Sequence, residues 1–204
     1  MLEAADLACT RGTRRLFEAI SFLLPRGEVL RVRGENGSGK TSLLRILAGL
    51  SPAAHGEVRW NERPIRRQRE EYAAEMVFIG HSNALKDDLT AAENLRYGLA
   101  LAGVAASRVQ IGDALAEEGL ARAADLPIQW LSQGQRRRVA LVRLAFCGAR
   151  RLWILDEPFS GLDRAAVTRL AARMSMHVRE GGVVVYTTHQ EIDLRLPARD
   201  LDLQ

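Results

Sequence analysis

Residues 34–41 read GENGSGKT and carry glycines, a lysine and a threonine in the spacing G-x-x-x-x-G-K-[ST]. Gly34 and Gly39 let the backbone wrap so that its N–H groups point at phosphate oxygens, and a following helix aims its positive N-terminal end at the same place. Lys40 would neutralise the β- and γ-phosphates, and the Thr41 hydroxyl would ligate Mg²⁺. An incidental glycine turn is disfavoured because a strand-like stretch precedes the pattern and a helical one follows it.

Two carboxylates end the apolar stretch LWILDEP at residues 152–158. Ligands of α/β sheets bind beyond the carboxyl ends of the strands, which disfavours a merely solvated turn here. We expect Asp156 to hold Mg²⁺ through its waters and Glu157 to polarise an attacking water. His189 follows another apolar stretch, residues 183–188; by itself it could equally be a core residue, but its place at a strand end favours contact with the γ-phosphate.

A second polar helix start opens LSQGQRRRVALVRLAF at residues 131–146. Ser132 and Gly134 precede three arginines, Arg136 to Arg138, and an apolar pattern of helical spacing follows. This helix start also suits an anion. The sequence therefore predicts two anion-binding helix ends in one short chain.

The elements that position these residues alternate along the chain. Strands are expected at residues 19–24, 28–32, 57–60, 76–79, 151–155 and 183–188. Helices are expected at residues 41–47, 90–95, 107–118, 131–146 and 163–179. Thr90 and Glu93 form a capping box, and Gly49 and Gly119 are helix stops. The alternation predicts an α/β fold with a mostly parallel sheet, interrupted by a helical insertion over residues 83–145. The strand before GENGSGKT reads L-R-V-R, so one face of this strand should be less buried than usual.

The composition is that of an ordinary globular domain, with 47% apolar and 26% charged residues in 204. The net charge is +4, but the arginines are scattered and offset by 25 acids, so no nucleic-acid partner is expected. Cys9 and Cys147 are expected to be buried thiols in a reducing compartment. No signal peptide and no apolar run of membrane-spanning length is expected.

Taken together, these motifs resemble those of the ATP-binding cassette (ABC) ATPases. GENGSGKT resembles Walker A, LWILDE Walker B, LSQGQ the signature LSGGQ, SGLD at residues 160–163 the D-loop, and His189 the switch histidine. The resemblance implies a P-loop NTPase made of one domain, residues 1–204. Its core would be about 1–82 and 146–204, with a small N-terminal antiparallel β part, and its helical subdomain about 83–145.

The resemblance also implies a homodimer in which each ATP lies between Walker A of one subunit and the signature of the other. The second helix start would then serve the partner's γ-phosphate. Catalytic roles fall to Glu157, His189 and His81, and metal binding to Thr41 and Asp156. Residues expected to bind ATP are Gly34, Glu35, Asn36, Gly37, Ser38, Gly39, Lys40, Thr41, Ser42, Arg11, Ser132, Gly134, Gln135 and Asp163.

The chain departs from the family pattern at several places. His81 stands where the Q-loop glutamine is expected, and an imidazole keeps part of its hydrogen bonding but is a poor Mg²⁺ ligand. Arg11 stands where an aromatic residue stacks on adenine; a guanidinium can stack, and Phe17 is a second candidate. Gln133 and Gly161 replace the signature glycine and the D-loop alanine.

The motif variants most resemble the ATP-binding subunit of the bacterial haem exporter of cytochrome c maturation, which lacks C-terminal extensions; few residues follow His189 here. This implies an ATPase at the cytoplasmic face of the inner membrane, bound to membrane permease subunits. No haem site is apparent, since the four histidines show no ligand spacing. The alternative is an ABC ATPase that acts without a permease, such as an iron–sulfur assembly cassette.

Overall fold

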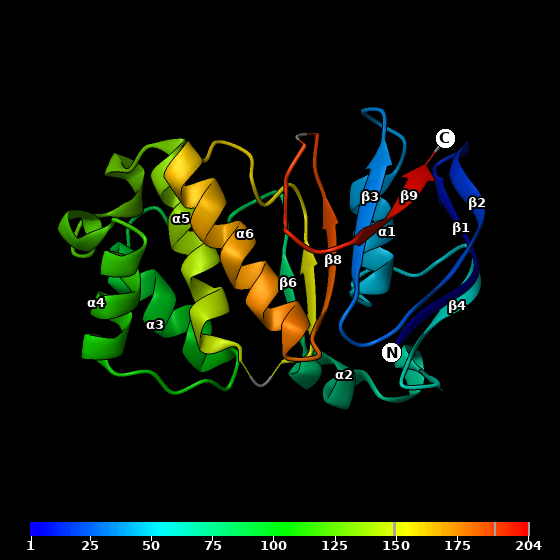
Figure 1. Cartoon of the computed structure of the whole chain (residues 1–204), viewed down its shortest axis with the longest axis horizontal. Helices are drawn as coiled ribbons and strands as arrows, with labels where there is room; N and C mark the ends of the chain where they lie inside the picture. Colours follow the sequence, from blue (N-terminus) through cyan, green and yellow to red (C-terminus); the bar gives the residue numbers. More distant parts are fainter. Residues whose placement is uncertain (149, 190, 204) are drawn as a thin grey trace. The chain divides into compact units, whose positions relative to one another are not determined.

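The computed structural model describes residues 1–148, 150–189 and 191–203 (Figure 1). Its contacts divide the chain into two compact units. The sheet unit comprises residues 1–78, 149–157 and 171–204, and the helical unit comprises residues 79–148 and 158–170.

The first sheet of the sheet unit is antiparallel, in the order β2-β1-β4-β5. Its strands are β1 (Leu2–Arg11), β2 (Arg14–Leu24), β4 (His55–Trp60) and β5 (Arg63–Pro64). The resemblance implied an N-terminal antiparallel part, but the residue pattern predicted no strand at β1, because its alternation of buried residues breaks at a register shift between Ala4 and Leu7, where Asp6 adopts φ +50°. An interrupted alternation carries a weak strand signal.

The second sheet has the order β6-β7-β8-β3-β9. Its strands are β6 (Met76–Ile79), β7 (Leu152–Leu155), β8 (Val183–Thr187), β3 (Val29–Gly34) and β9 (Ala198–Leu203). β3 pairs in parallel with both β8 and β9, and β7 pairs in parallel with β8. Every residue of β7 and β8 is buried, as the continuous apolar stretches predicted.

The edge strand β9 explains the arginines of β3. Arg31 donates from Nε and Nη2 to the two carboxylate oxygens of Asp200 at 2.6 and 2.9 Å, and Arg33 pairs with Glu191 at 3.0 Å. The guanidinium of Arg31 holds the pKa of Asp200 below its usual range. The polar face expected from L-R-V-R is thus confirmed, whereas β9 was missed because its own residues are largely charged.

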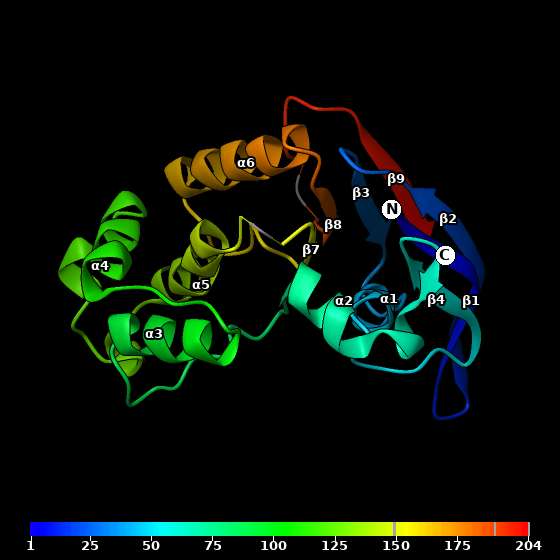
Figure 2. The ribbon, with the colours of Figure 1, turned by 90° about the horizontal axis from the view of Figure 1, so that it is seen from below.

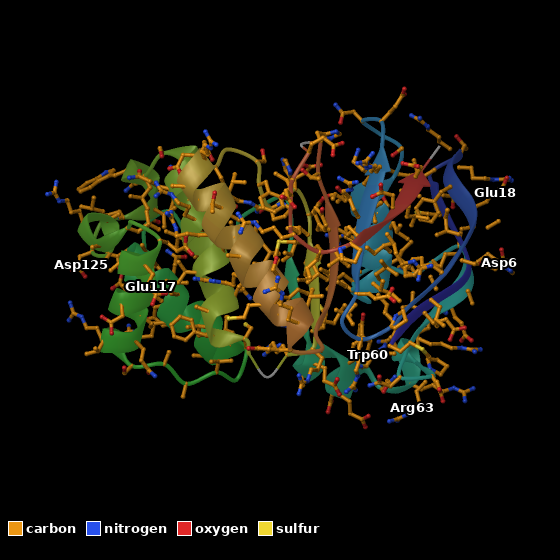
Figure 3. The ribbon with its side chains drawn as sticks, viewed as in Figure 1. Asp6, Glu18, Trp60, Arg63, Glu117 and Asp125 are labelled. Atoms are coloured by element: carbon orange, nitrogen blue, oxygen red, sulfur yellow. The ribbon has the colours of Figure 1, made fainter. Side chains whose placement is uncertain are left out.

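Helix α1 (Lys40–Leu47) contacts β1 of the antiparallel sheet and β3, β7 and β8 of the parallel sheet (Figures 1 and 2). Gly49 ends it in the left-handed region, and Leu50 N–H donates to the Arg45 carbonyl. The unpredicted helix α2 (Arg69–Glu75) is held by Tyr72, whose hydroxyl donates to the Leu47 carbonyl at 2.6 Å. The buried Trp60, labelled in Figure 3, donates to Glu75 of the same helix.

The helical unit contains α3 (Ala91–Leu101), α4 (Arg108–Glu117), α5 (Gln133–Val142) and the first part of α6 (Arg164–Arg179). Capping boxes start α3 at Thr90, α4 at Ser107 and α5 at Ser132. Glu117 and Asp125 are exposed on this unit (Figure 3). In the described part of the chain, no helix is both long and apolar enough to cross a membrane.

His177 lies buried in the sheet unit, 5% exposed, and its ring stacks on Trp153 with 3.9 Å between centroids. Gly182 is required beside it, since a Cβ there would lie 2.2 Å from Nε2 of His177. Burial, and to a smaller extent the nearby charge of Arg151, lower the pKa of His177 to about 4. The folded protein therefore holds this ring neutral.

Acidification should destabilise the protein through His177. The unfolded chain takes up the proton near pH 6.5 and the folded chain only near the depressed pKa of about 4, so the free energy of unfolding should fall by about 2 kcal/mol as the pH drops from 7 to 5. Urea unfolding at pH 7 and pH 5 measures this loss. His177→Phe should reduce it, whereas replacing the exposed His55 by glutamine should not; equal losses in both variants would contradict the assignment.

Candidate functional site

Three strand ends of the sheet unit meet at one edge of the parallel sheet. Because β3, β8 and β7 run parallel, their carboxyl ends lie on the same side, as the arrowheads of β3 and β8 show in Figure 1. Gly34 ends β3, Asp156 follows β7 and His189 follows β8. The structure thus brings together three motifs that are far apart in the sequence.

Two glycines confine the loop between β3 and α1. Gly34 has φ +142°, and a Cβ there would lie 2.5 Å from the Leu203 carbonyl oxygen and 2.6 Å from Ser38 Oγ. Gly39 has φ +101°, and a Cβ there would lie 3.0 Å from the Phe17 ring. Neither position accepts a side chain without a shift of its surroundings. Between them, the exposed crest of the loop consists of Glu35, Asn36 and Gly37.

Lys40 closes over this loop. It is 8% exposed, and its Nζ donates to the carbonyl oxygens of Gly34 and Glu35 at 2.8 and 2.9 Å. The Ser38 hydroxyl is buried and has no hydrogen-bond partner among the described residues. The first turn of α1 contains no acidic residue, so no carboxylate offsets its positive end. A buried ammonium and an unpartnered hydroxyl beside a helix N-terminus suit a phosphate.

Asp156 is the centre of a hydrogen-bonded cluster behind the loop. It is 2% exposed, and its two carboxylate oxygens accept from Thr41 Oγ1 and Thr187 Oγ1, both at 2.8 Å. Thr187 Oγ1 in turn accepts from the backbone N–H of Glu157 at 2.8 Å. Ser42 lies half-buried in the first turn of α1. A hydroxyl and a carboxylate oxygen in contact are the ligand types that Mg²⁺ prefers, so Thr41 and Asp156 fit that ion.

Thr187 is a residue of this cluster that sequence reasoning missed. It is fully buried at the end of β8, where it links the two consecutive carboxylate residues. A signal was present, since Thr187 is the first polar residue after the apolar run 183–186. Polar groups that end a buried strand at the site edge are candidates for the same reason as Asp156.

Glu157 and His189 form a pair at the same edge. Nε2 of His189 lies 3.4 Å from Oε1 of Glu157. Glu157 adopts φ +49°, which is unusual for a residue with a side chain and is typical of functional sites. His189 is half-exposed, whereas Glu157 is mostly buried. The pair can hold a water between itself and the phosphate loop.

The two candidates for base stacking lie in different environments. Arg11 is exposed at the turn end of β1, opposite Arg14. Phe17 is 5% exposed and its ring edge packs on Gly39 of the loop. A hollow of about 450 Å³ opens beside it, lined by Arg15, Leu16, Phe17, Glu18, Ile20 and Asp202.

In the helical unit, the start of α5 is organised by its own side chains. Ser132 Oγ accepts from Gln135 N–H at 3.2 Å, and Gln135 Oε1 accepts from Ser132 N–H at 2.8 Å. Gln135, expected to bind the ligand, therefore uses its carbonyl oxygen in the cap and keeps its amide nitrogen as a donor. The Ser132 hydroxyl hydrogen also remains a donor, because the hydroxyl oxygen only accepts in the cap.

Gly134 packs against the turn that contains Gly161. A Cβ at Gly134 would lie 2.5 Å from the Gly161 carbonyl oxygen, so only glycine fits this close approach. Asp163 ends that turn and caps α6, accepting from the Ala166 N–H at 2.8 Å. This hydrogen bond holds the pKa of Asp163 below its usual range. The LSQGQ and SGLD segments thus form one packed surface within the helical unit.

His81 is exposed in the loop between β6 and α3. The residues on either side of it are anchored, since Arg137 Nη1 donates to the Gly80 carbonyl at 2.9 Å and to Asn83 Oδ1 at 3.0 Å. The histidine itself is left accessible on a fixed loop.

Comparison with known proteins agrees with this geometry. The sequence model of the ABC transporter family matches residues 17–160. The chain is 52% identical over its whole length to the cytochrome c biogenesis ATP-binding export protein CcmA of Aromatoleum aromaticum, covering 95% of that protein. It is 48% identical to the protein of the same name from Pseudomonas aeruginosa, over 96% of each chain.

Solved structures agree on the fold. A structure described as the ATP-binding subunit of an ABC transporter superposes with a TM-score of 0.81 at 27% identity, over 93% of this chain and 80% of the other. The ADP- and phosphate-bound dimer of the cassette MJ0796 superposes with a TM-score of 0.84 at 23% identity, over 100% of this chain and 94% of the other. The chain therefore belongs to the ABC transporter family and is an ATP-binding cassette ATPase, most similar among the relatives named here to the ATP-binding export proteins of cytochrome c biogenesis.

Proposed function

We propose that this chain is the ATP-hydrolysing subunit of a bacterial exporter that moves haem, or releases a haem–chaperone complex, during cytochrome c biogenesis. The observation that supports the ATPase role most directly is the contact of Asp156 with Thr41, at the foot of a loop in which Gly34 and Gly39 leave no room for a side chain. The names of relatives about 50% identical over nearly the whole chain support the process.

ATP binding would change the partners of the loop residues. Lys40 would exchange the carbonyls of Gly34 and Glu35 for phosphate oxygens, and Ser38 would gain the partner that its hydroxyl lacks among the described residues. Thr41 and Asp156 would hold Mg²⁺, which neutralises charge on the phosphates. Adenine would lie in the hollow beside Phe17, with the exposed Arg11 as a second stacking partner.

Hydrolysis would be the task of the Glu157–His189 pair. Glu157 would orient and polarise the attacking water, and His189 would donate a hydrogen bond to the γ-phosphate, as its position 3.4 Å from the glutamate allows. Thr187 would position Glu157 through its backbone N–H. His81 would contribute one hydrogen bond near the water in place of the family's glutamine, without binding Mg²⁺ directly.

The α5 tip would act on the nucleotide of a second copy. Ser132 and Gly134 would donate to the partner's γ-phosphate, so ATP would hold a homodimer together and its cleavage would let the subunits part. The dimers described for the MJ0796 cassette support this arrangement. Asp163 would line the same interface through the turn that packs on Gly134.

Gly134→Ala tests the role of this tip. The added methyl would force the α5 tip and the Gly161 turn apart, so ATP turnover should fall by about 100-fold while nucleotide binding to a monomer is unchanged. Gly112→Ala is the matched control, because nothing lies within 4 Å of a Cβ there. A steady-state phosphate-release assay measures the turnover. Unchanged turnover in Gly134→Ala would argue against a role of the α5 N-terminus in ATP hydrolysis.

Membrane attachment would be peripheral, through permease subunits at the cytoplasmic face. The chain should sediment with membranes from cells that express those subunits and be released when they are absent, and deleting its gene should abolish mature cytochrome c. The alternative, an ABC ATPase of iron–sulfur assembly, predicts instead a chain that stays off the membrane and binds an assembly scaffold; that outcome would overturn the export proposal.

A further inference from the structure

The three consecutive arginines of α5, Arg136 to Arg138, do not simply add positive charge to the helix start. Arg137 is 4% exposed, and its Nη1 donates to two acceptors that flank His81, the Gly80 carbonyl and Asn83 Oδ1. Taking a guanidinium out of water is costly, so the two hydrogen bonds that Nη1 donates stabilise Arg137 in its buried place. This contact connects α5 to the loop that contains His81.

Arg136 makes a second tie to the same loop. Its Nε and Nη2 donate to the carbonyls of Leu131 and Gln129, just before the Ser132 cap, and its Nη1 reaches Asp87 at 3.5 Å. Arg138 differs, because its Nη1 donates to the Glu118 carbonyl at the end of α4. Two of the three arginines thus join the α5 tip to the loop.

The far end of the loop is fixed independently. Asn94 of α3 is buried, accepts from Lys86 N–H at 2.7 Å, and donates to the carbonyls of Lys86, Leu89 and Thr90. The segment 80–90 is therefore pinned at one end to α3 and at the other to α5. A displacement of the His81 end can reach the Ser132 tip through Arg137 without bending a helix.

We propose that Arg137, assisted by Arg136, is a positioning residue that couples the two nucleotide sites of the dimer. His81 would sense the nucleotide of its own chain, and the α5 tip of the same chain would engage the nucleotide of the partner. Arg137 would transmit occupancy of one site to the other, which makes ATP hydrolysis cooperative. This rests on the proposed dimer.

The ATP dependence of hydrolysis by the full chain tests the coupling. The unmodified protein should show a Hill coefficient of about 1.5–2, and Arg137→Gln should lower it toward 1 and raise KM more than it lowers kcat. Asn83→Ala removes one of the two acceptors of Arg137, and Asn83 is only half-buried. This variant should therefore also lower the Hill coefficient, even if Arg137→Gln impairs folding. Arg122→Gln, an exposed arginine of the same unit, is the control and should leave the curve unchanged.

The double variant separates coupling from general damage. If Arg137 and Asn83 act through one contact, Arg137→Gln combined with Asn83→Ala should be no less cooperative than Arg137→Gln alone. The inference would be overturned if both single variants kept the Hill coefficient of the unmodified protein, or if their effects on it added in the double variant. The proposed ATPase function would stand in either case. A lack of ATP-dependent dimers in the unmodified chain would instead overturn the proposed function.

Discussion

Replacing Lys40 by alanine should weaken ATP binding by about 100-fold, the equivalent of one charge-assisted contact of about 3 kcal/mol. The ammonium is 8% exposed and is already held over the loop by two carbonyl oxygens, so little ordering cost remains when it turns to a phosphate. Its loss leaves phosphate charge uncompensated at the centre of the site. Titration with a fluorescent ATP analogue measures the change.

The chain supplies its own control for this substitution. Lys86 is the other lysine in the sequence, and it is exposed, with its backbone rather than its side chain bound by Asn94. Lys86→Ala removes the same charge and should bind ATP normally. Thermal unfolding of both variants would show that they are folded. If Lys40→Ala bound ATP with an affinity within about threefold of that of the unmodified protein, the assignment of this loop as the phosphate site would be wrong.

The parts of the site that sequence reasoning found are those with local signals. The spacing from Gly34 to Thr41 and the polar ends of β7 and β8 follow from strand, loop and helix in immediate succession. The capping box at Thr90 and the polar helix start at Ser132 are local in the same way. Parallel pairing then brings the strand ends together, which the alternation of strands and helices predicted.

Other features depend on partners distant in sequence. β9 is a partly charged strand that pairs with β3, where Asp200 meets Arg31, 169 residues earlier in the chain. Arg137 is an unremarkable helix residue until Gly80 and Asn83 are placed against it. The need for glycine at Gly134 comes from the Gly161 carbonyl, not from its own backbone, so no propensity reveals it. These contacts are set by tertiary packing.

Glu157→Gln should reduce ATP hydrolysis by about 10²–10⁴-fold and leave ATP binding intact. The amide keeps the size of the side chain and tolerates the φ of +49° as the glutamate does, but it cannot accept the proton of the attacking water. The Glu157 N–H bond to Thr187 comes from the backbone, so the cluster around Asp156 should survive. Because cleavage would be blocked, the variant should accumulate as an ATP-bound dimer.

Size-exclusion chromatography with ATP and a phosphate-release assay would together measure this result. Glu180→Gln, an exposed acid of the same unit, should hydrolyse ATP normally and remain monomeric after turnover. His189→Ala should also slow hydrolysis, since it removes the group 3.4 Å from Glu157 that would contact the γ-phosphate. Turnover within tenfold of the unmodified protein in Glu157→Gln would show that another group accepts the proton. A Glu157→Gln variant that does not hydrolyse ATP but stays monomeric would still support Glu157 as the base. It would contradict the proposal that ATP joins two copies, because the uncleaved γ-phosphate would then not bind Ser132 of a partner.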